Sequence, residues 1–261
     1  MPTNQRPRNF RIFLWLLVLL LVGATQYLTQ YRATRWDHTL WAVIYPINGD
    51  NSAVTTQYIA GLTPENFESL GQFFSEEAKL YSLPLAEPVT FKLAPPVKVA
   101  PPRLPKQPFK VYEVMLWSLK LRYWAWRHDS HHGPRADIRM FVVYHDPAIT
   151  QSLEHSVGLS KGMLGVVNAF AAKKQSGMNN VVIAHELLHT VGATDKYDLA
   201  TNQPIYPDGY AEPERPNRYP QRFAEIMGGR IPLSQEDAEM PRSLDFTLIG
   251  PLTAREINWR K

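Results

Sequence analysis

The chain has 261 residues, of which 44% are hydrophobic and 20% are charged, and this ordinary globular composition excludes wholesale disorder. It contains no cysteine, which excludes a thiol nucleophile, a disulfide framework and a thiolate metal site, so any metal must be held by His, Asp, Glu or Tyr. The formal net charge of +4 comes entirely from residues 1–32, and the neutral remainder lacks the basic surface that nucleic-acid binding requires.

The N-terminal segment combines arginines with a long apolar run. Residues 12–24 are all apolar and follow Arg6, Arg8 and Arg11, and twenty uncharged residues separate Arg11 from Arg32. The apolar run matches the core of a signal peptide with a small-residue cleavage site at 22–24, whereas the whole uncharged stretch can span a bilayer. A buried core helix is a third interpretation.

Residues 1–32 are therefore predicted to be a cytoplasmic tip followed by a transmembrane anchor or a signal peptide. The membrane is then a partner of this segment. Because the arginines stay in the cytoplasm, residues 33–261 lie outside it, in a single-pass membrane protein or a secreted one.

The first half of the body predicts two strands and a helix. Residues 39–47 are rich in β-branched and aromatic side chains, which is typical of a strand, and a second short strand is expected at 89–93. Between them, Thr63-Pro64 is typical of a helix start, and apolar residues recur at helical spacing from there to Ser82.

A proline-rich connector follows at residues 94–108, which contain six prolines. Proline removes a backbone donor and favours an extended chain, so we expect this segment to lie over the surface of the domain. A disordered hinge between two domains is the alternative.

The second half predicts one long helix and two more strands. Residues 109–127 carry large apolar side chains, among them Met115, Leu119 and three tryptophans, and predict a mostly buried helix. Residues 138–144 are the strongest strand, and 163–170 a weaker one with Gly165 as a possible bulge. This order of elements predicts the α/β (α+β) class, a mixed sheet with helices packed on it.

The segment from Asn180 to Asp198 carries the chemistry. Asn180 is a suitable helix N-cap, and the apolar residues that follow predict a buried helix. His185 and His189 are four residues apart, so both imidazoles project from one face and can bind one metal ion. Glu186 lies beside that face, where a carboxylate can take the proton from a metal-bound water that attacks a carbonyl.

A third ligand is expected just after this helix. Gly192 can end the helix in the left-handed conformation, and Asp195 is then placed to offer an oxygen ligand. The sequence leaves alternatives open: Asp195, Tyr197 and Asp198 could fix the loop by hydrogen bonds or bind a second cation. The rival third ligands are Glu212, Glu214 and Glu225.

The motif HExxHxxGxxD, residues 185–195, resembles the metzincin clan of zinc metallopeptidases, in the snapalysin-like variant where aspartate replaces the third histidine. The resemblance covers residue 137 to the C-terminus. It implies a metzincin-like fold with a zinc-site helix, a methionine turn at residues 225–229 with Met227 below the metal, and an edge strand near 162–170 that holds an extended substrate. Between Asp195 and Met227 lies a loop of thirty-one residues, either a substrate-selecting element or a solvated excursion.

These observations predict a zinc-dependent endopeptidase with Zn²⁺ on His185, His189 and Asp195, with Glu186 as the general base and a protein or peptide as substrate. Two alternatives remain: a zinc amidase that acts on a non-protein envelope polymer, and a membrane-tethered binding protein with a structural zinc site.

The remaining polar clusters carry weaker signals. The histidines at 128–132 are typical of a solvated turn, the final residues 252–259 predict a short closing helix, and three tyrosines after the motif are candidate oxyanion donors (Tyr197, Tyr206 and Tyr210).

Overall fold

The structure, a computed structural model, describes residues 6–105, 108 and 110–260. Four parts of the predictions lie outside the described residues: residues 1–5 of the cytoplasmic tip, 106–107 of the connector, Phe109 at the start of the long helix, and residue 261.

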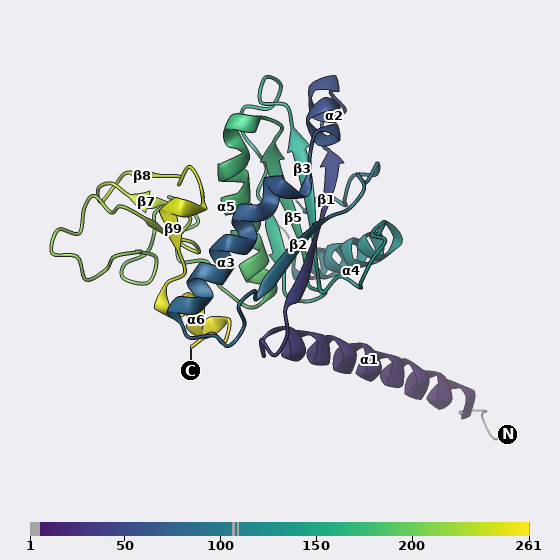
Figure 1. Cartoon of the computed structure of the whole chain (residues 1–261). Helices are drawn as coiled ribbons and strands as arrows, with labels where there is room; N and C mark the ends of the chain where they lie inside the picture. Colours follow the sequence, from purple (N-terminus) through teal and green to yellow (C-terminus); the bar gives the residue numbers. More distant parts are fainter. Residues whose placement is uncertain (1–5, 106–107, 109, 261) are drawn as a thin grey trace.

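A five-stranded mixed sheet forms the centre of the molecule (Figure 1). Its strand order is β2-β1-β3-β5-β4. Four strands run parallel: β1 (Leu40–Asn48), β2 (Val89–Leu93), β3 (Ile138–His145) and β5 (Leu164–Phe170). The predicted mixed α/β class is confirmed.

The edge strand differs from the expectation. Residues 164–170 form β5, which lies inside the sheet, and the antiparallel edge is β4 (Val157–Leu159). A strand of three residues is too short to produce an alternating pattern in the sequence. The predicted bulge at Gly165 is also wrong, because the pairing of β5 with both neighbours is regular. Glycine leaves room there for the end of the Met140 side chain, whose Cε atom would lie 2.7 Å from a Cβ atom at this position.

Helices cover both faces of the sheet. On one face, α2 (Ala53–Ala60), α3 (Glu68–Leu80) and α5 (Ser176–Thr190) surround a large hydrophobic core (Figure 1). On the other face, α4 (Val111–Arg127) packs over a smaller core. Alternate residues of β1 serve the two cores, because side chains along a strand point to opposite faces.

Two helix starts differ from the predictions. The predicted helix from Pro64 begins as a 3-10 turn, η1 (Pro64–Phe67), before α3. The helix α5 begins at Ser176, so Asn180 is not its N-cap. The buried Asn180 amide instead donates to the Asn66 carbonyl and the Ser69 hydroxyl, at 2.9 and 3.0 Å. An asparagine before an apolar run is typical of an N-cap, but it can also lie inside a helix. Only the fold shows which groups its side chain contacts.

The long helix α4 is buried on only one face. Trp117 and Trp124 are buried, as predicted, but Met115, Leu119 and Trp126 are exposed. The prediction of a mostly buried helix is therefore wrong. A helix in an outer layer buries the stripe that faces the sheet, and nothing in the described part of the chain covers its opposite face.

The N-terminal helix α1 (Arg6–Ala33) is continuous and projects from the body (Figure 1). Its described apolar side chains, among them Phe13 and Trp15, are exposed, and Ala33 and Trp36 anchor its end in the core. Among the described residues, no helix combines the length and the apolarity that crossing a membrane requires. The choice between anchor and signal peptide stays a prediction.

The proline-rich segment runs along the sheet. Ala94 and Val97 donate backbone hydrogen bonds to the Ile44 and Pro46 carbonyls, at 2.8 and 2.9 Å. The Trp117 indole of α4 donates to the Pro102 carbonyl at 2.9 Å. The described residues 94–105 are thus held against the domain by specific hydrogen bonds.

The C-terminal part packs beside α5 and contains only short elements. The last helix, α6 (Pro251–Glu256), is shorter than the predicted range 252–259, although Ile257 and Trp259 are buried. In the described residues, the remaining elements are a 3-10 turn before α5 and five short elements after it: η2 (Lys173–Gln175), β6 (Ala224–Glu225), β7 (Ile231–Pro232), β8 (Ala238–Glu239), η3 (Leu244–Phe246) and β9 (Thr247–Leu248).

Candidate metal centre

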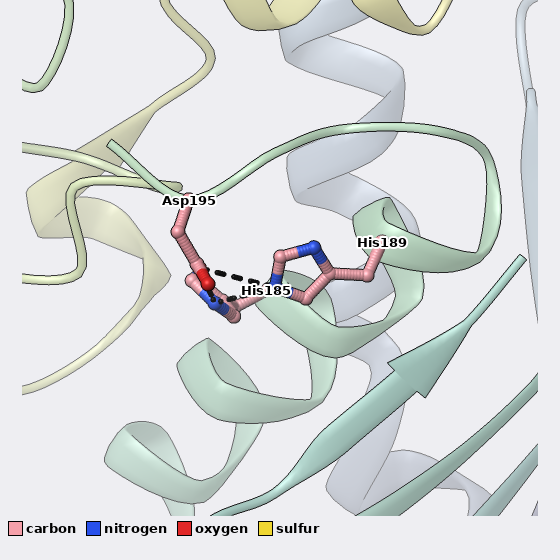
Figure 2. A group of neighbouring side chains, drawn as sticks. All are labelled: His185, His189 and Asp195. Carbon is pink, nitrogen blue, oxygen red and sulfur yellow. Dashed lines mark hydrogen bonds and ion pairs between the residues drawn. The ribbon is translucent and has the colours of Figure 1, made fainter. Parts of the chain in front are cut away.

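Helix α5 presents two histidines on one face. The His185 and His189 Nε2 atoms lie 3.1 Å apart, and their rings meet edge to face (Figure 2). This follows from their spacing, since residues four apart lie one turn above the other. The helix is held in place by its buried apolar side chains, which pack in the larger core.

Asp195 returns to the same point from the loop after α5 (Figure 2). Gly192 has a φ angle of +111°, as the sequence predicts for a residue that ends the helix. The Asp195 Oδ1 atom lies 3.1 Å from the Nε2 atom of each histidine. Zinc bonds of 2.0–2.2 Å in a tetrahedron place ligand atoms about 3.3–3.6 Å apart, so this triangle has the size of a metal site.

Hydrogen bonds to backbone carbonyls orient both imidazole rings. The Nδ1 atoms of His185 and His189 lie 2.9 Å from the backbone carbonyls of Ile226 and Ala193. A carbonyl only accepts, so each Nδ1 carries a proton, and each Nε2 points toward Asp195. Each Nε2 atom can therefore either donate a proton to the Asp195 carboxylate or, when deprotonated, offer a lone pair to a metal ion at the same point.

The electrostatics of the group also favour positive charge. Burial lowers the pKa of His185, but the Asp195 carboxylate and the other nearby acceptors outweigh it and raise that pKa to about 9. Burial raises the pKa of Asp195, but hydrogen bonds with the two histidines hold it well below its usual range. The residues fit a metal ion with one oxygen and two nitrogen ligands.

Glu186 lies next to this group with an unpaired oxygen atom. Its carboxylate is buried, and within the described residues no donor reaches Oε2. Burial raises the pKa of Glu186, although the histidines and the backbone N–H of Gly158 lower it. A buried acceptor without a partner costs free energy, so such a group is retained when a proton or a water completes it.

Two cavities adjoin the group, one beside each histidine. The first has a volume of about 420 Å³ and is lined by His185, Glu186, Tyr197 and Arg230, among others. The second, of about 350 Å³, is lined by His189 and by residues of β4 and the loop after α5. The edge strand β4 contributes to the second cavity and lies against α5.

The rival ligands are engaged elsewhere. The buried Glu225 carboxylate accepts hydrogen bonds from the Gly228 and Gly250 N–H groups and the Thr253 hydroxyl, at 2.8, 3.0 and 2.6 Å. It thereby ties the turn at 225–229 to the start of α6. Glu212 pairs with Arg222, and Glu214 is exposed and outside the converging group.

The other candidate residues separate by their surroundings. The Asp198 carboxylate accepts from Ala200 and Thr201, so it fixes the loop by hydrogen bonds. Tyr197 lines the larger cavity, whereas the rings of Tyr206 and Tyr210 meet edge to face in the long loop. In the described part of the chain, the histidines at 128–132 form no metal-ligating group.

The sequence did not reveal a brace behind Asp195. The buried Lys196 ammonium lies 2.7 Å from the Glu256 carboxylate, which also accepts from the Thr194 N–H and hydroxyl at 3.0 and 2.7 Å. Lys196 also donates its backbone N–H to the Met227 carbonyl at 2.9 Å. These contacts hold the loop that carries Asp195 between α6 and the turn at 225–229. Sixty residues separate Lys196 from Glu256, so no local pattern could indicate the pair.

Replacing Glu256 with alanine is expected to lower the free energy of unfolding by about 2–4 kcal/mol, because it leaves the buried Lys196 ammonium without its carboxylate. The double variant Lys196→Met/Glu256→Leu should recover most of that stability. It should still bind metal more weakly than the wild type, since Thr194 has lost its acceptor. Denaturant unfolding and metal titration measure both effects; equal metal affinity in all three proteins would rule out a positioning role.

Gly158 in β4 is a second residue that sequence reasoning missed. A Cβ atom at this position would lie 2.2 Å from the Glu186 carbonyl oxygen and 2.6 Å from the His189 Cβ atom. The Glu186 carbonyl belongs to the backbone of α5 and the His189 Cβ atom is bonded directly to that backbone, so neither atom can move aside freely. The close approach of the edge strand to α5 therefore requires glycine.

Replacing Gly158 with alanine is expected to push β4 away from α5 and to cost about 1–3 kcal/mol of stability, with weakened metal binding. The matched control is Gly71→Ala in α3, where the nearest atom to a new Cβ lies 3.9 Å away and alanine should stabilise the helix by up to about 1 kcal/mol. Thermal unfolding with and without metal compares the two. If both variants change thermal stability and metal binding equally, the close-packing argument is contradicted.

Compared with known proteins, the chain matches no family model and no curated protein.

Proposed function

We propose that this protein is a zinc-dependent endopeptidase of the metzincin type, with the metal held by His185, His189 and Asp195. Two imidazole nitrogens and one carboxylate oxygen suit zinc, and a structural zinc site would require a fourth protein ligand. Among the described residues the converging group contributes three. The observation that carries the proposal is the buried, unpaired Glu186 Oε2 atom beside these three side chains.

Each residue has a definite task in this mechanism. When bound, zinc supplies a Lewis acid for the scissile carbonyl and lowers the pKa of a water. Glu186 accepts the proton of the attacking water at its unpaired oxygen and passes it to the leaving nitrogen. Burial and the carboxylates of Asp195 and Glu186 raise the pKa of Tyr197 to about 12, so its hydroxyl stays protonated and can donate to the developing oxyanion.

The surroundings of the group favour a peptide as the substrate. The open side of β4 offers backbone groups that can pair with an extended chain, which favours peptides over other amides. Arg230 lines the larger cavity together with Glu154 and Glu186, and its permanent positive charge can pair with an acidic side chain of a substrate. As part of the same proposal, residues 1–32 hold this domain at a membrane or export it, in keeping with the exposed apolar side chains of α1.

The test is cleavage of a mixed peptide library by the purified full chain in detergent, read by mass spectrometry beside a metal analysis. We expect one zinc per chain, loss of cleavage on chelation, recovery on adding zinc, and cut sites with an acidic residue nearby. If zinc is bound but no peptide is cleaved, the proposed substrate would be wrong, and a zinc hydrolase acting on a non-peptide amide would replace it. A protein that binds no zinc would refute it.

A further inference from the structure

The outward face of α4 is an apolar stripe. Six large side chains on this helix are between 53% and 68% exposed: Tyr112, Met115, Leu116, Leu119, Tyr123 and Trp126. At 100° per residue they fall within an arc of about 100°, opposite the residues that pack on the sheet. The stripe runs for about 20 Å along the helix.

Such a stripe differs from ordinary surface composition. Single exposed apolar residues are common, but a continuous row of six marks a contact surface. The residues on the buried face, Trp117, Leu121 and Trp124, already satisfy the packing of α4 on the sheet. The outer stripe is therefore not needed to hold the helix in the fold.

Basic residues border the stripe. Lys120 and Arg127 lie along one side of it and Arg122 along the other, and Lys110 precedes the helix. Glu113 is the only acidic residue between Lys110 and Arg127. Tyrosine and tryptophan together with flanking basic residues are the composition of helices that lie in the interface of a bilayer with anionic lipids.

The position of α4 agrees with this composition. Arg32 at the end of α1 and Gly162 line one cavity, and a Cβ atom on Gly162 would lie 2.9 Å from the Arg122 Cδ atom of α4. The exit of α1 and the edge of α4 are therefore close. In Figure 1, α1 extends away from the sheet toward the side on which α4 lies, and its described apolar side chains are exposed.

We propose that the outward face of α4 binds an anionic lipid surface, with the apolar stripe at the level of the headgroups and its basic borders on the lipid charges. A second copy of the chain is a poorer occupant, because an isologous contact would bring the positive borders of two stripes together. Ser118 of α4 lines the cavity beside His189, so a docked α4 would hold the candidate metal centre close to the membrane surface.

The absence of cysteine allows a site-specific test on the full chain. Spin labels are attached to Leu119→Cys and Tyr123→Cys, and to Leu80→Cys, an exposed leucine of α3, as the matched control. Each protein is reconstituted into vesicles of phosphatidylcholine with or without phosphatidylglycerol. Collision of the label with oxygen reports lipid contact, and collision with a nickel chelate reports contact with water.

We expect labels at 119 and 123 to become oxygen-accessible in anionic vesicles while the label at Leu80→Cys stays in water. In the double variant Lys120→Glu/Arg127→Glu, the preference of α4 for vesicles with phosphatidylglycerol over vesicles without it should fall at least about fivefold for each reversed charge. Labels on α4 that remain as water-accessible as the control would overturn the proposal. So would spin–spin coupling between copies, which would assign the stripe to a dimer.

Discussion

Replacing Glu186 with glutamine is expected to lower peptide hydrolysis about a thousandfold while one zinc stays bound. Glutamine keeps the shape of the side chain but cannot take a proton from water. In the proposed site the histidines would bind zinc through Nε2 atoms whose orientation is set by the Ile226 and Ala193 carbonyls, so we expect metal binding not to depend on Glu186. Steady-state cleavage and metal content are measured on the same samples.

The stability of this variant gives an independent readout. The Glu186 carboxylate is buried, and one of its oxygens has no donor within the described residues, so removing its charge should leave the free energy of unfolding unchanged or raise it. The control is Glu154→Gln, because Glu154 lines the same cavity but is exposed. Loss of zinc from the Glu186 variant, or equal loss of turnover in both variants, would falsify this division of roles.

Replacing Asp195 with alanine is expected to weaken zinc binding by more than about a hundredfold, since removal of even an indirect ligand partner costs ten to a hundredfold. The loop is braced independently by Lys196 and Glu256, so the fold should persist without the carboxylate. In the wild type, zinc at a hundred times its dissociation constant adds about 2.7 kcal/mol to the free energy of unfolding. The variant should show little of this gain at the same zinc concentration.

Two further variants distinguish Asp195 from its rivals. Asp198→Ala removes a carboxylate three residues away that fixes the loop through Ala200 and Thr201, and it should lower stability without changing zinc affinity. Glu225→Gln should destabilise the turn at 225–229 more than it weakens the site. If Glu225→Gln weakens zinc binding and Asp195→Ala does not, the third ligand is assigned wrongly.

The residues that form the candidate metal centre could be found in the sequence because most of its geometry is local. His185 and His189 are one helical turn apart, and Glu186 lies between them on the chain. Gly192 allows the reversal that brings Asp195 back within a few residues. The 3.6-residue period places His185, Glu186 and His189, and the conformational freedom of glycine makes Asp195 a candidate, although its rivals could be set aside only in the fold.

The supports of the centre could not be found in this way. The Lys196–Glu256 pair, the contacts of Glu225 with the start of α6, and the approach of Gly158 to α5 all join segments far apart in the sequence. The edge strand β4 is recognisable only by its pairing with β5, because three residues carry no periodic signal.

The sequence by itself determined the composition, the alternation of strands and helices, and the local motif, because each depends on residues within one or two turns of one another. Only the tertiary structure decided which face of α4 is covered, whether Asn180 caps a helix or lies within one, and which carboxylates face the centre. The physical reason is that burial and hydrogen-bond partners belong to pairs of distant segments. The sequence pattern around an apolar residue such as Trp126 is the same whether the fold buries that residue or leaves it exposed.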